Sequence, residues 1–323
     1  MSLEELEARL FHIFEAEFAV AFTDQEKEIL CTNINYYVMY RDELLENYKK
    51  LLYYIRPKVV LYAESFTGEK VVLTEALKEI KIPCIEILHG YMTDNTVEYN
   101  YLETGINNAL PDYIFTYSQV QKDIIRWGIP KDHVRVVGHP WLEKRKRELL
   151  QCNFDKNKSK KVVTFISNAN LSIIKYLTFV ADLLDPDKYE LKLKLHPTEI
   201  QENYQDLPDS IEIIYGNRAD VQDIHYYLAK SDIVVGIAST ALYEAAIYPV
   251  EIFVLQESEF EIMNLMLESE RATLVNSPEQ LYEFVISESR QKSSESMNFF
   301  ATNAIDHINK QINMIIEETK KVC

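Results

Sequence analysis

The segment with the clearest chemical pattern is residues 231–246, which read SDIVVGIASTALYEAA. Residues 233–235 are β-branched, as in a buried parallel strand, and the small residues Gly236, Ala238, Ser239 and Thr240 follow. The hydroxyls of Ser239 and Thr240 are placed to cap a helix whose first N–H groups have no partner within that helix. Because this end of a helix attracts anions, the segment predicts a contact with a phosphate group.

A second strand end carries a histidine. Residues 189–197 read YELKLKLHP, so an alternating strand ends at His196 and Pro197 turns the chain. Ligands of parallel sheets bind at the carboxyl ends of the strands, which makes His196 and Pro197 candidate neighbours of the same phosphate. A histidine bonded to nearby backbone is the structural alternative.

Three further polar residues accompany these strand ends. Ser167 and Asn168 follow the strand at residues 162–166 and are candidates for a phosphate contact, with a plain turn as the alternative. Glu244 lies one turn into the helix after Thr240. It is a candidate acceptor for the hydroxyls of a ribose or sugar, with a solvated carboxylate as the alternative.

The composition narrows the function classes. A net charge of −17 argues against general binding of nucleic acid, which needs a basic face. Neither GxGxxG nor GxxxxGK[ST] occurs, which disfavours a dinucleotide or P-loop enzyme. The histidines lack the spacing of metal ligands, so we expect no metal and no cofactor. Four scattered cysteines, and no apolar run near about 20 residues, favour a cytoplasmic protein.

Strands and helices alternate along most of the chain. Residues 1–55 have helical spacing, and the first run of strands is expected at residues 58–64, 84–90, 113–118 and 134–138. A second run is expected at residues 162–166, 191–195, 211–215, 233–235 and 252–255, and residues 280–321 read as helical throughout.

This alternation predicts the fold class. Strands separated by helices imply parallel sheets with right-handed crossovers. The polar residues 153–161 are the best candidate linker. We therefore expect an α/β protein with two doubly wound, Rossmann-like domains, at residues 1–152 and 153–323, whose strand ends face one cleft. The first is expected on the acceptor side, and the second is expected to bind the nucleotide.

Three segments carry a resemblance to the GT-B family of glycosyltransferases. Residues 111–118 (PDYIFTYS), continuing to residues 134–140 (VRVVGHP), resemble the stretch that closes the first domain of that family. Residues 193–197 (LKLHP) and 231–246 resemble its donor-binding elements. The combination of His-Pro with Ser-Thr is most similar to bacterial enzymes with CMP- or CDP-activated donors. These include polysialyltransferase-like capsule enzymes and the glycerophosphate transferases of teichoic acid synthesis.

The first domain departs from the family pattern. It offers only four convincing strands, and its opening 55 residues are helical where a full first domain would begin with a strand. We therefore expect either a compacted variant or a piece of a longer protein. Because acceptors bind the first domain in this family, the acceptor site is the least defined part.

Glycosyl transfer needs a base that deprotonates the acceptor hydroxyl. His89 is the first choice, because a similarly placed His-Gly supplies the proposed base in the glycerophosphate transferases and Gly90 follows here. An unperturbed imidazole has a pKa of about 6.5, close to the working range of a base. A hydrogen-bonded turn histidine is the alternative. Glu64, at the end of the preceding strand, is the second choice, and Asp94 is the third.

The resemblance implies a glycosyltransferase that moves a sugar or sugar-like group from a CMP- or CDP-type donor, without a metal. The implied acceptor is a bacterial surface polysaccharide or its lipid-linked precursor, with peripheral association at the inner face of the membrane through the acceptor or a partner protein. Two alternatives stay open. One is an enzyme of the UDP-GlcNAc 2-epimerase type, whose acidic residue and double glycine are replaced here by residues 237–240 (IAST). The other is a non-catalytic partner protein with the same fold.

Overall fold

The computed structural model describes residues 3–18, 21–101, 109–152, 159–199, 201–215, 223–287 and 298–322. The chain forms two compact units. The first comprises Met1–Ile87, Thr104–Ile114 and Ile312–Cys323, and the second comprises Leu88–Glu103 and Phe115–Gln311. Residues 153–158 of the predicted linker lie outside the described residues, and the division at residues 152 and 153 stays a prediction.

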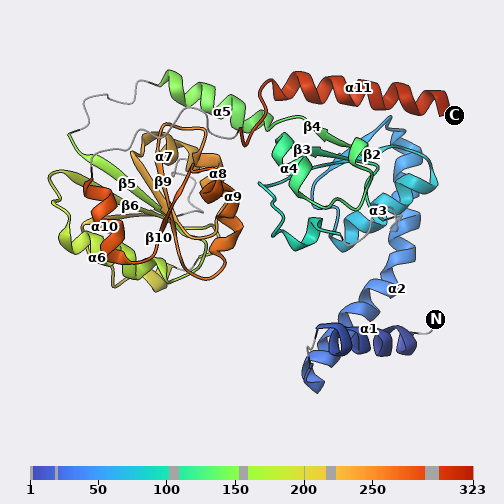
Figure 1. The fold of residues 1–323 in the computed structure, drawn as a ribbon. Coiled ribbons are helices and arrows are strands. Elements are labelled where there is room, and N and C mark those ends of the chain that lie inside the picture. Colours follow the sequence, from blue (N-terminus) through green and yellow to red (C-terminus); the bar gives the residue numbers. More distant parts are fainter. Residues whose placement is uncertain are drawn as a thin grey trace. The chain divides into compact units, whose positions relative to one another are not determined.

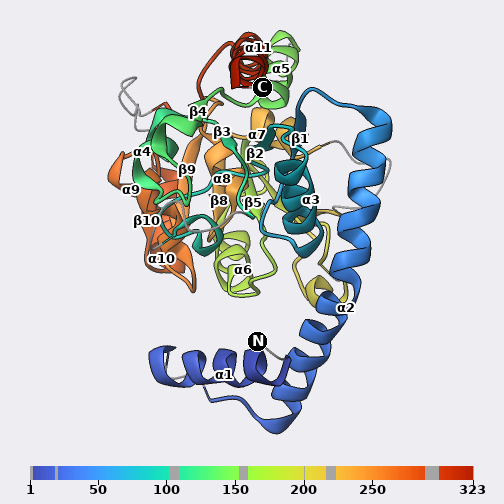
Figure 2. The same ribbon diagram turned by 90° about the vertical axis from the view of Figure 1, so that its right-hand side faces the viewer.

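The first unit begins with two helices, α1 (Leu3–Phe18) and α2 (Asp24–Ile55). A capping box starts α2, because the Thr23 hydroxyl accepts from the Glu26 N–H while the Glu26 carboxylate accepts from the Thr23 N–H. Helix α3 (Gly68–Glu79) packs against α2, and Leu45 and Leu52 join Val72 and Leu77 in one apolar cluster there. Figure 2 shows α3 between α2 and the strands β1 and β2.

The first sheet has the four predicted strands. They are β1 (Val60–Tyr62), β2 (Cys84–Ile87), β3 (Tyr113–Thr116) and β4 (Val134–Val136), and they lie in the order β1-β2-β3-β4. β1 pairs with β2 in parallel. Short elements follow these strands: η1 (Val97–Tyr99), α4 (Gln119–Ile124), η2 (Lys131–His133) and α5 (Pro140–Gln151). Neighbours in this sheet are also neighbours in sequence.

The second sheet has a different order. Its strands are β5 (Lys161–Ile166), β6 (Tyr189–Lys194), β7 (Ile211–Ile214), β8 (Ile233–Gly236), β9 (Glu251–Leu255) and β10 (Thr273–Val275). They lie in the order β10-β9-β8-β5-β6-β7, and each neighbouring pair is parallel. The chain therefore moves outward from β5 to β7 and then returns to the other side of β5. The strand order reverses between β5 and β8, which is where doubly wound sheets bind ligands.

Helices cover both faces of the second sheet, as Figure 1 shows. On one face α6 (Ile173–Leu183) packs beside α10 (Pro278–Ile286), over a core that includes Phe165, Leu193 and Val235. The other face carries α7 (Ile224–Lys230) and α8 (Thr240–Ala245), and α5 packs against α7. η3 (Gln201–Tyr204), η4 (Phe260–Met263) and α9 (Asn264–Glu268) are connections. The predicted α/β class with two parallel sheets is confirmed.

Two features differ from the prediction. The three-residue strand β10 was not expected, because so short an apolar run has no periodicity to distinguish it. Residues 280–321 are not helical throughout: α10 ends at Ile286, Ser287 has extended backbone angles, and α11 starts only at Ala304 (Ala304–Val322). Residues 288–297 lie outside the described residues.

Candidate functional site

The strand reversal in the second sheet is bridged by one side chain. Ile166 pairs with Gly236 at the ends of β5 and β8, and Asn168 and Ala238 lie two residues further along each chain. The Asn168 side-chain amide donates to the Ala238 carbonyl at 3.1 Å. Ala169 has a φ of 66°, a left-handed angle that is unfavourable for a residue with a side chain. The chain therefore has an unfavourable backbone turn at the point where a ligand is expected.

Asn168 also carries an unused acceptor. In the described part of the chain, its Oδ1 atom is buried and has no hydrogen-bond partner. A buried carbonyl without a partner costs free energy, about 1–3 kcal/mol in mutational data. A ligand hydroxyl or N–H at this position would remove that cost. Asn168 was predicted from its place after β5, and its role as a ligand contact stays a prediction.

His196 is exposed and held in one orientation. Its Nδ1 atom accepts from the Thr198 N–H at 3.3 Å and lies 2.8 Å from the Thr198 hydroxyl oxygen. Because Nδ1 accepts from a backbone N–H, the neutral ring carries its proton on Nε2. His196 can therefore donate from Nε2 to an anion in the neutral state. The exposed Pro197 follows it and turns the chain.

The loop after β6 is tied to the end of β5 by Glu199. This carboxylate accepts from the His196 N–H at 2.5 Å and from the Ser167 hydroxyl at 2.6 Å. It also accepts from the Tyr204 hydroxyl. Burial, assisted by Glu199, raises the pKa of Tyr204 to about 12, so this hydroxyl stays protonated. Ser167 is buried and its hydroxyl is directed to Glu199, so its predicted contact with phosphate stays a prediction.

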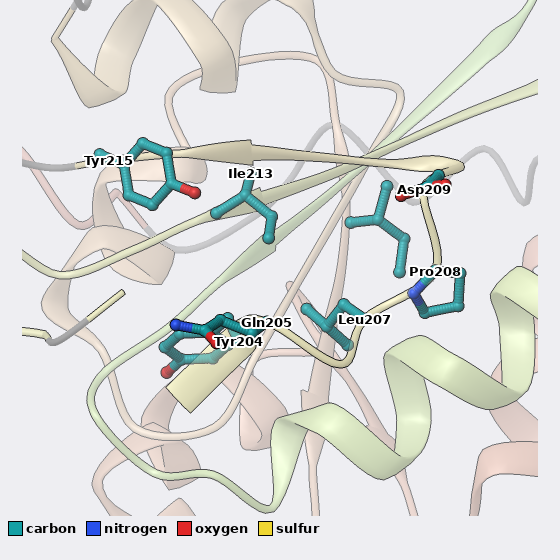
Figure 3. Close-up of a pocket in the computed structure, with 8 residues that line it drawn as sticks. Tyr204, Gln205, Leu207, Pro208, Asp209, Ile213 and Tyr215 are labelled. Carbon is teal, nitrogen blue, oxygen red and sulfur yellow. The ribbon is translucent and has the colours of Figure 1, made fainter. Parts of the chain in front are cut away.

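Tyr204 also borders a pocket of about 340 Å³ beside the edge strand β7. Figure 3 shows Tyr204, Leu207, Ile213 and Tyr215 among the residues that line it. The network around Glu199 therefore joins the strand ends to this pocket.

The predicted helix after β8 is present but short. The Ser239 hydroxyl accepts from the Ala241 N–H at 3.3 Å and caps α8, which has only six residues. With so few aligned peptides, the helix dipole is weak. An anion at this end would be bound mainly by the hydroxyls and the first N–H groups of the helix. Thr240 is exposed, and its methyl carbon lies 3.4 Å from the position that a Cβ atom on Gly90 would occupy. The loop after β2 therefore reaches α8 within the second unit.

That contact places the first-choice base near the strand reversal. His89 is exposed and directly precedes the buried Gly90. Asp94, five residues later, is exposed as well. Glu64 belongs to the first unit, where it is exposed and has a left-handed φ of 59°. The structure thus groups the loop after His89 with Thr240, and the predicted cleft that also includes Glu64 stays a prediction.

Glu244 has a protein partner. Its carboxylate lies 3.0 Å from Nε2 of His225, a histidine of α7 that is 1% exposed. The Tyr248 hydroxyl lies 3.3 Å from Nδ1 of the same ring. Glu244 itself is 20% exposed, so part of the carboxylate faces outward. Its predicted contact with a ribose or sugar stays a prediction, now with His225 as the group that orients it.

Two charged residues of this region were not singled out from the sequence. Glu199 organises the loop after β6, and Lys194, the last residue of β6, is only 6% exposed. A usable signal for Lys194 existed: Lys192 and Lys194 alternate with buried leucines and so point to a face that helices cover. For Glu199 no sequence signal existed, because two of its partners, Ser167 after β5 and Tyr204 of η3, lie outside its own loop.

The described residues contain no group of three or more His, Cys, Asp or Glu side chains suited to a metal ion. The prediction of metal-independent binding rests on the sequence pattern and stays a prediction. In the same part of the chain, no helix is both long and apolar enough to cross a membrane.

Comparison with known proteins supports the fold. No protein-family model and no curated protein matches the sequence. Among solved structures, UDP-GlcNAc 2-epimerase from Methanocaldococcus jannaschii is similar, with 15% identity, a TM-score of 0.60, and coverage of 92% of this chain and 84% of that one. UDP-GlcNAc 2-epimerase from Neisseria meningitidis, bound to UDP-GlcNAc, is similar with 15% identity, a TM-score of 0.57, and coverage of 86% and 81%.

A glycosyltransferase structure is similar as well. The glycotransferase of kitacinnamycin has 12% identity and a TM-score of 0.53, with coverage of 93% of this chain and 81% of that one. At these identities the likeness concerns the fold alone. The chain has the two-sheet GT-B-like fold that epimerases and glycosyltransferases share, which confirms the fold expected from the resemblance.

Proposed function

We propose that this protein is a nucleotide-sugar enzyme, and more specifically a glycosyltransferase, whose second sheet binds the nucleotide at the strand reversal. The observation that carries the proposal is the bridge from Asn168 to Ala238 between β5 and β8. It sets a buried acceptor, Asn168 Oδ1, which has no partner among the described residues, beside the two loops that carry His196 and Thr240. A sugar nucleotide offers both phosphate oxygens and hydroxyl donors to such a set.

The residues have distinct roles in this proposal. The Nε2 proton of His196 and the hydroxyls of Ser239 and Thr240 donate to the phosphate that leaves with the nucleotide. His89 takes the proton of the acceptor hydroxyl while the acceptor oxygen forms its bond to the anomeric carbon. The bond from that carbon to the phosphate oxygen breaks, and its electron pair leaves with the nucleotide. Glu244, held by His225, accepts from a ribose or sugar hydroxyl.

The proposal also specifies the chemical identity of the donor and of the acceptor. The His-Pro and Ser-Thr elements favour a CMP- or CDP-type donor, whereas the similar Neisseria meningitidis structure is bound to UDP-GlcNAc. A surface polysaccharide or its lipid-linked precursor is the proposed acceptor, used in the cytoplasm at the inner face of the membrane.

A second candidate function is epimerisation of a nucleotide sugar. It is favoured by the fold similarity to two UDP-GlcNAc 2-epimerases, with TM-scores of 0.60 and 0.57. The same nucleotide site serves both reactions. The two functions differ in the product, because a transferase releases free nucleotide with a new glycosidic bond and an epimerase returns an altered nucleotide sugar.

The test combines binding with product analysis. Calorimetry with CMP, CDP, UDP and GDP, with and without a chelator, should show binding of at least one nucleotide that the chelator leaves intact. Incubation with the matching sugar nucleotide should then release free nucleotide when an acceptor is present. Recovery of an epimeric nucleotide sugar would support the second candidate. Binding without turnover would support a non-catalytic partner, and no binding of any nucleotide would refute the proposal.

A further inference from the structure

Lys194 occupies an unusual position in the second sheet. At the level of this residue, the register aligns Ile214 of β7, Lys194, Ile166 of β5 and Gly236 of β8. The other three are apolar and buried, and Val254 of β9 extends the row. Register neighbours in a parallel sheet point to the same side, so Lys194 is the one charged side chain in an apolar row. Burying an amine in such a row is unfavourable for folding.

The amine of Lys194 is only partly satisfied. In the described part of the chain, its Nζ atom makes one hydrogen bond, to the carbonyl of the next residue, Leu195, at 3.2 Å. That bond directs the amine toward the carboxyl end of β6. Burial lowers the pKa of Lys194, and Glu199 is the charged group that opposes this shift. Glu199 is itself occupied by Ser167, Tyr204 and the His196 N–H.

An unused acceptor lies at the same end of the sheet. Asn168 and His196 come two residues after Ile166 and Lys194, and their strands are adjacent. The buried Oδ1 of Asn168 has no partner in the described residues, and two of the three hydrogens of a Lys194 ammonium have none either. A ligand with both an anionic oxygen and a hydroxyl donor satisfies both groups at once, as a sugar phosphate or a ribose phosphate does.

We infer that Lys194 binds the phosphate of the nucleotide and that Asn168 Oδ1 accepts from a hydroxyl of the same ligand. The inference rests on the proposed function for the identity of the ligand. On this inference, the positively charged group that contacts the phosphate is the last residue of β6, two positions before His196. It also explains why a residue that is unfavourable for folding stands in an otherwise apolar row, because binding sites retain such residues at the expense of stability.

Lys194→Met tests the inference, with Lys192→Met as the matched control. Lys192 lies on the same strand and face but pairs with Glu190 and Glu212. By calorimetry, Lys194→Met should weaken binding of CDP and UDP by about 10- to 100-fold, the effect of losing a hydrogen bond to a charged group. Cytidine and uridine, which lack phosphate, should bind both variants and the unaltered protein alike. Lys192→Met should bind the nucleotides normally.

Two further readouts separate a ligand contact from a structural role. Lys194→Met should unfold at the same temperature as the unaltered protein or higher, since it removes a charge from an apolar row. Because phosphate stabilises the charged amine, binding of CDP or UDP should take up protons as the pH rises toward the lowered pKa of Lys194, seen in a pH series as a dependence of the binding enthalpy on the buffer. Lys194→Met should lose this uptake. Lys194→Gln should repeat the weaker binding if the Met variant folds poorly.

The outcomes distinguish this inference from the proposed function. If the unaltered protein binds CDP or UDP and Lys194→Met binds it equally well, the inference is wrong and the proposed function stands. If the unaltered protein binds neither CDP, UDP, CMP nor GDP, both are wrong. Loss of binding together with a lower unfolding temperature in both the Met and the Gln variants would contradict the inference and assign Lys194 a structural role.

Discussion

The two sheets of this protein differ in their strand order. In the first sheet the order β1-β2-β3-β4 follows the sequence, and in the second the order reverses between β5 and β8. A sheet without a reversal offers single loops at its carboxyl edge, whereas a reversal sends two neighbouring connections to opposite faces and leaves a crevice between them. We therefore propose the second sheet as the nucleotide site, and the loop after β2 of the first sheet carries the candidate base.

The largest expected effect concerns that loop. His89→Ala should lower transfer by about 10² to 10⁴, the usual contribution of a general base. Nucleotide affinity should change little, because the proposed phosphate donors lie on the second sheet. Transfer rates and calorimetry on the same preparations measure both quantities. Glu64→Ala is measured beside it as the rival candidate, and if it abolishes transfer while His89→Ala does not, the carboxylate is the base.

Two glycines after strands of the first sheet should respond differently to alanine. Gly138 has a φ of +85°, and a Cβ atom there would lie 2.3 Å from the Ala301 carbonyl oxygen. Gly138→Ala should therefore lower the free energy of unfolding by about 2–4 kcal/mol. At Gly90 the added carbon meets only flexible or ordinary contacts, 3.3 Å from Met92 Cε, so Gly90→Ala should cost less than about 1 kcal/mol. Equal losses in denaturant unfolding would contradict these contacts.

On the second sheet, His196→Ala should weaken nucleotide binding by about 1–3 kcal/mol, the range for a hydrogen bond to a charged group. The reason is the loss of the Nε2 donor that the Thr198 contacts orient. Unfolding should change little, because the ring is exposed. His307→Ala, an exposed histidine of α11, serves as the control in the same calorimetric titration. Unchanged affinity in His196→Ala would remove this residue from the site.

The smallest expected effect is a pH dependence of stability at His139, the residue that caps α5. Burial lowers the pKa of His139, with Glu244 opposing the shift and His225 adding to it. Between about pH 6.5 and the lower folded pKa, the unfolded chain binds a proton at this residue that the folded chain does not, so stability falls as the pH drops from about 7 through the folded pKa. His139→Asn keeps a side chain suited to capping α5 and should show a smaller fall. An equal fall in melting temperature from pH 7 to 5.5 in the unaltered protein and in His139→Asn would contradict this expectation.

The sequence predicted the elements of the site better than the pairings within it. The strand ends at Ser167, His196 and Ser239 follow from local patterns of apolar and small residues, and the structure has those strands. The partners of these residues could not be predicted, because Glu199 reaches back to β5 and His225 reaches Glu244 from another helix. Such contacts depend on which strands are neighbours, and the reversal between β5 and β8 is a property of the whole sheet.

The central claim is that the nucleotide binds at the carboxyl end of the second sheet. Hydrogen–deuterium exchange with saturating CDP or UDP tests it most directly. We predict slower exchange in residues 166–172, 194–199 and 236–246, with residues 60–80 of the first unit unchanged. Slower exchange confined to residues 60–80, or none in the three segments despite measured binding, would contradict the account.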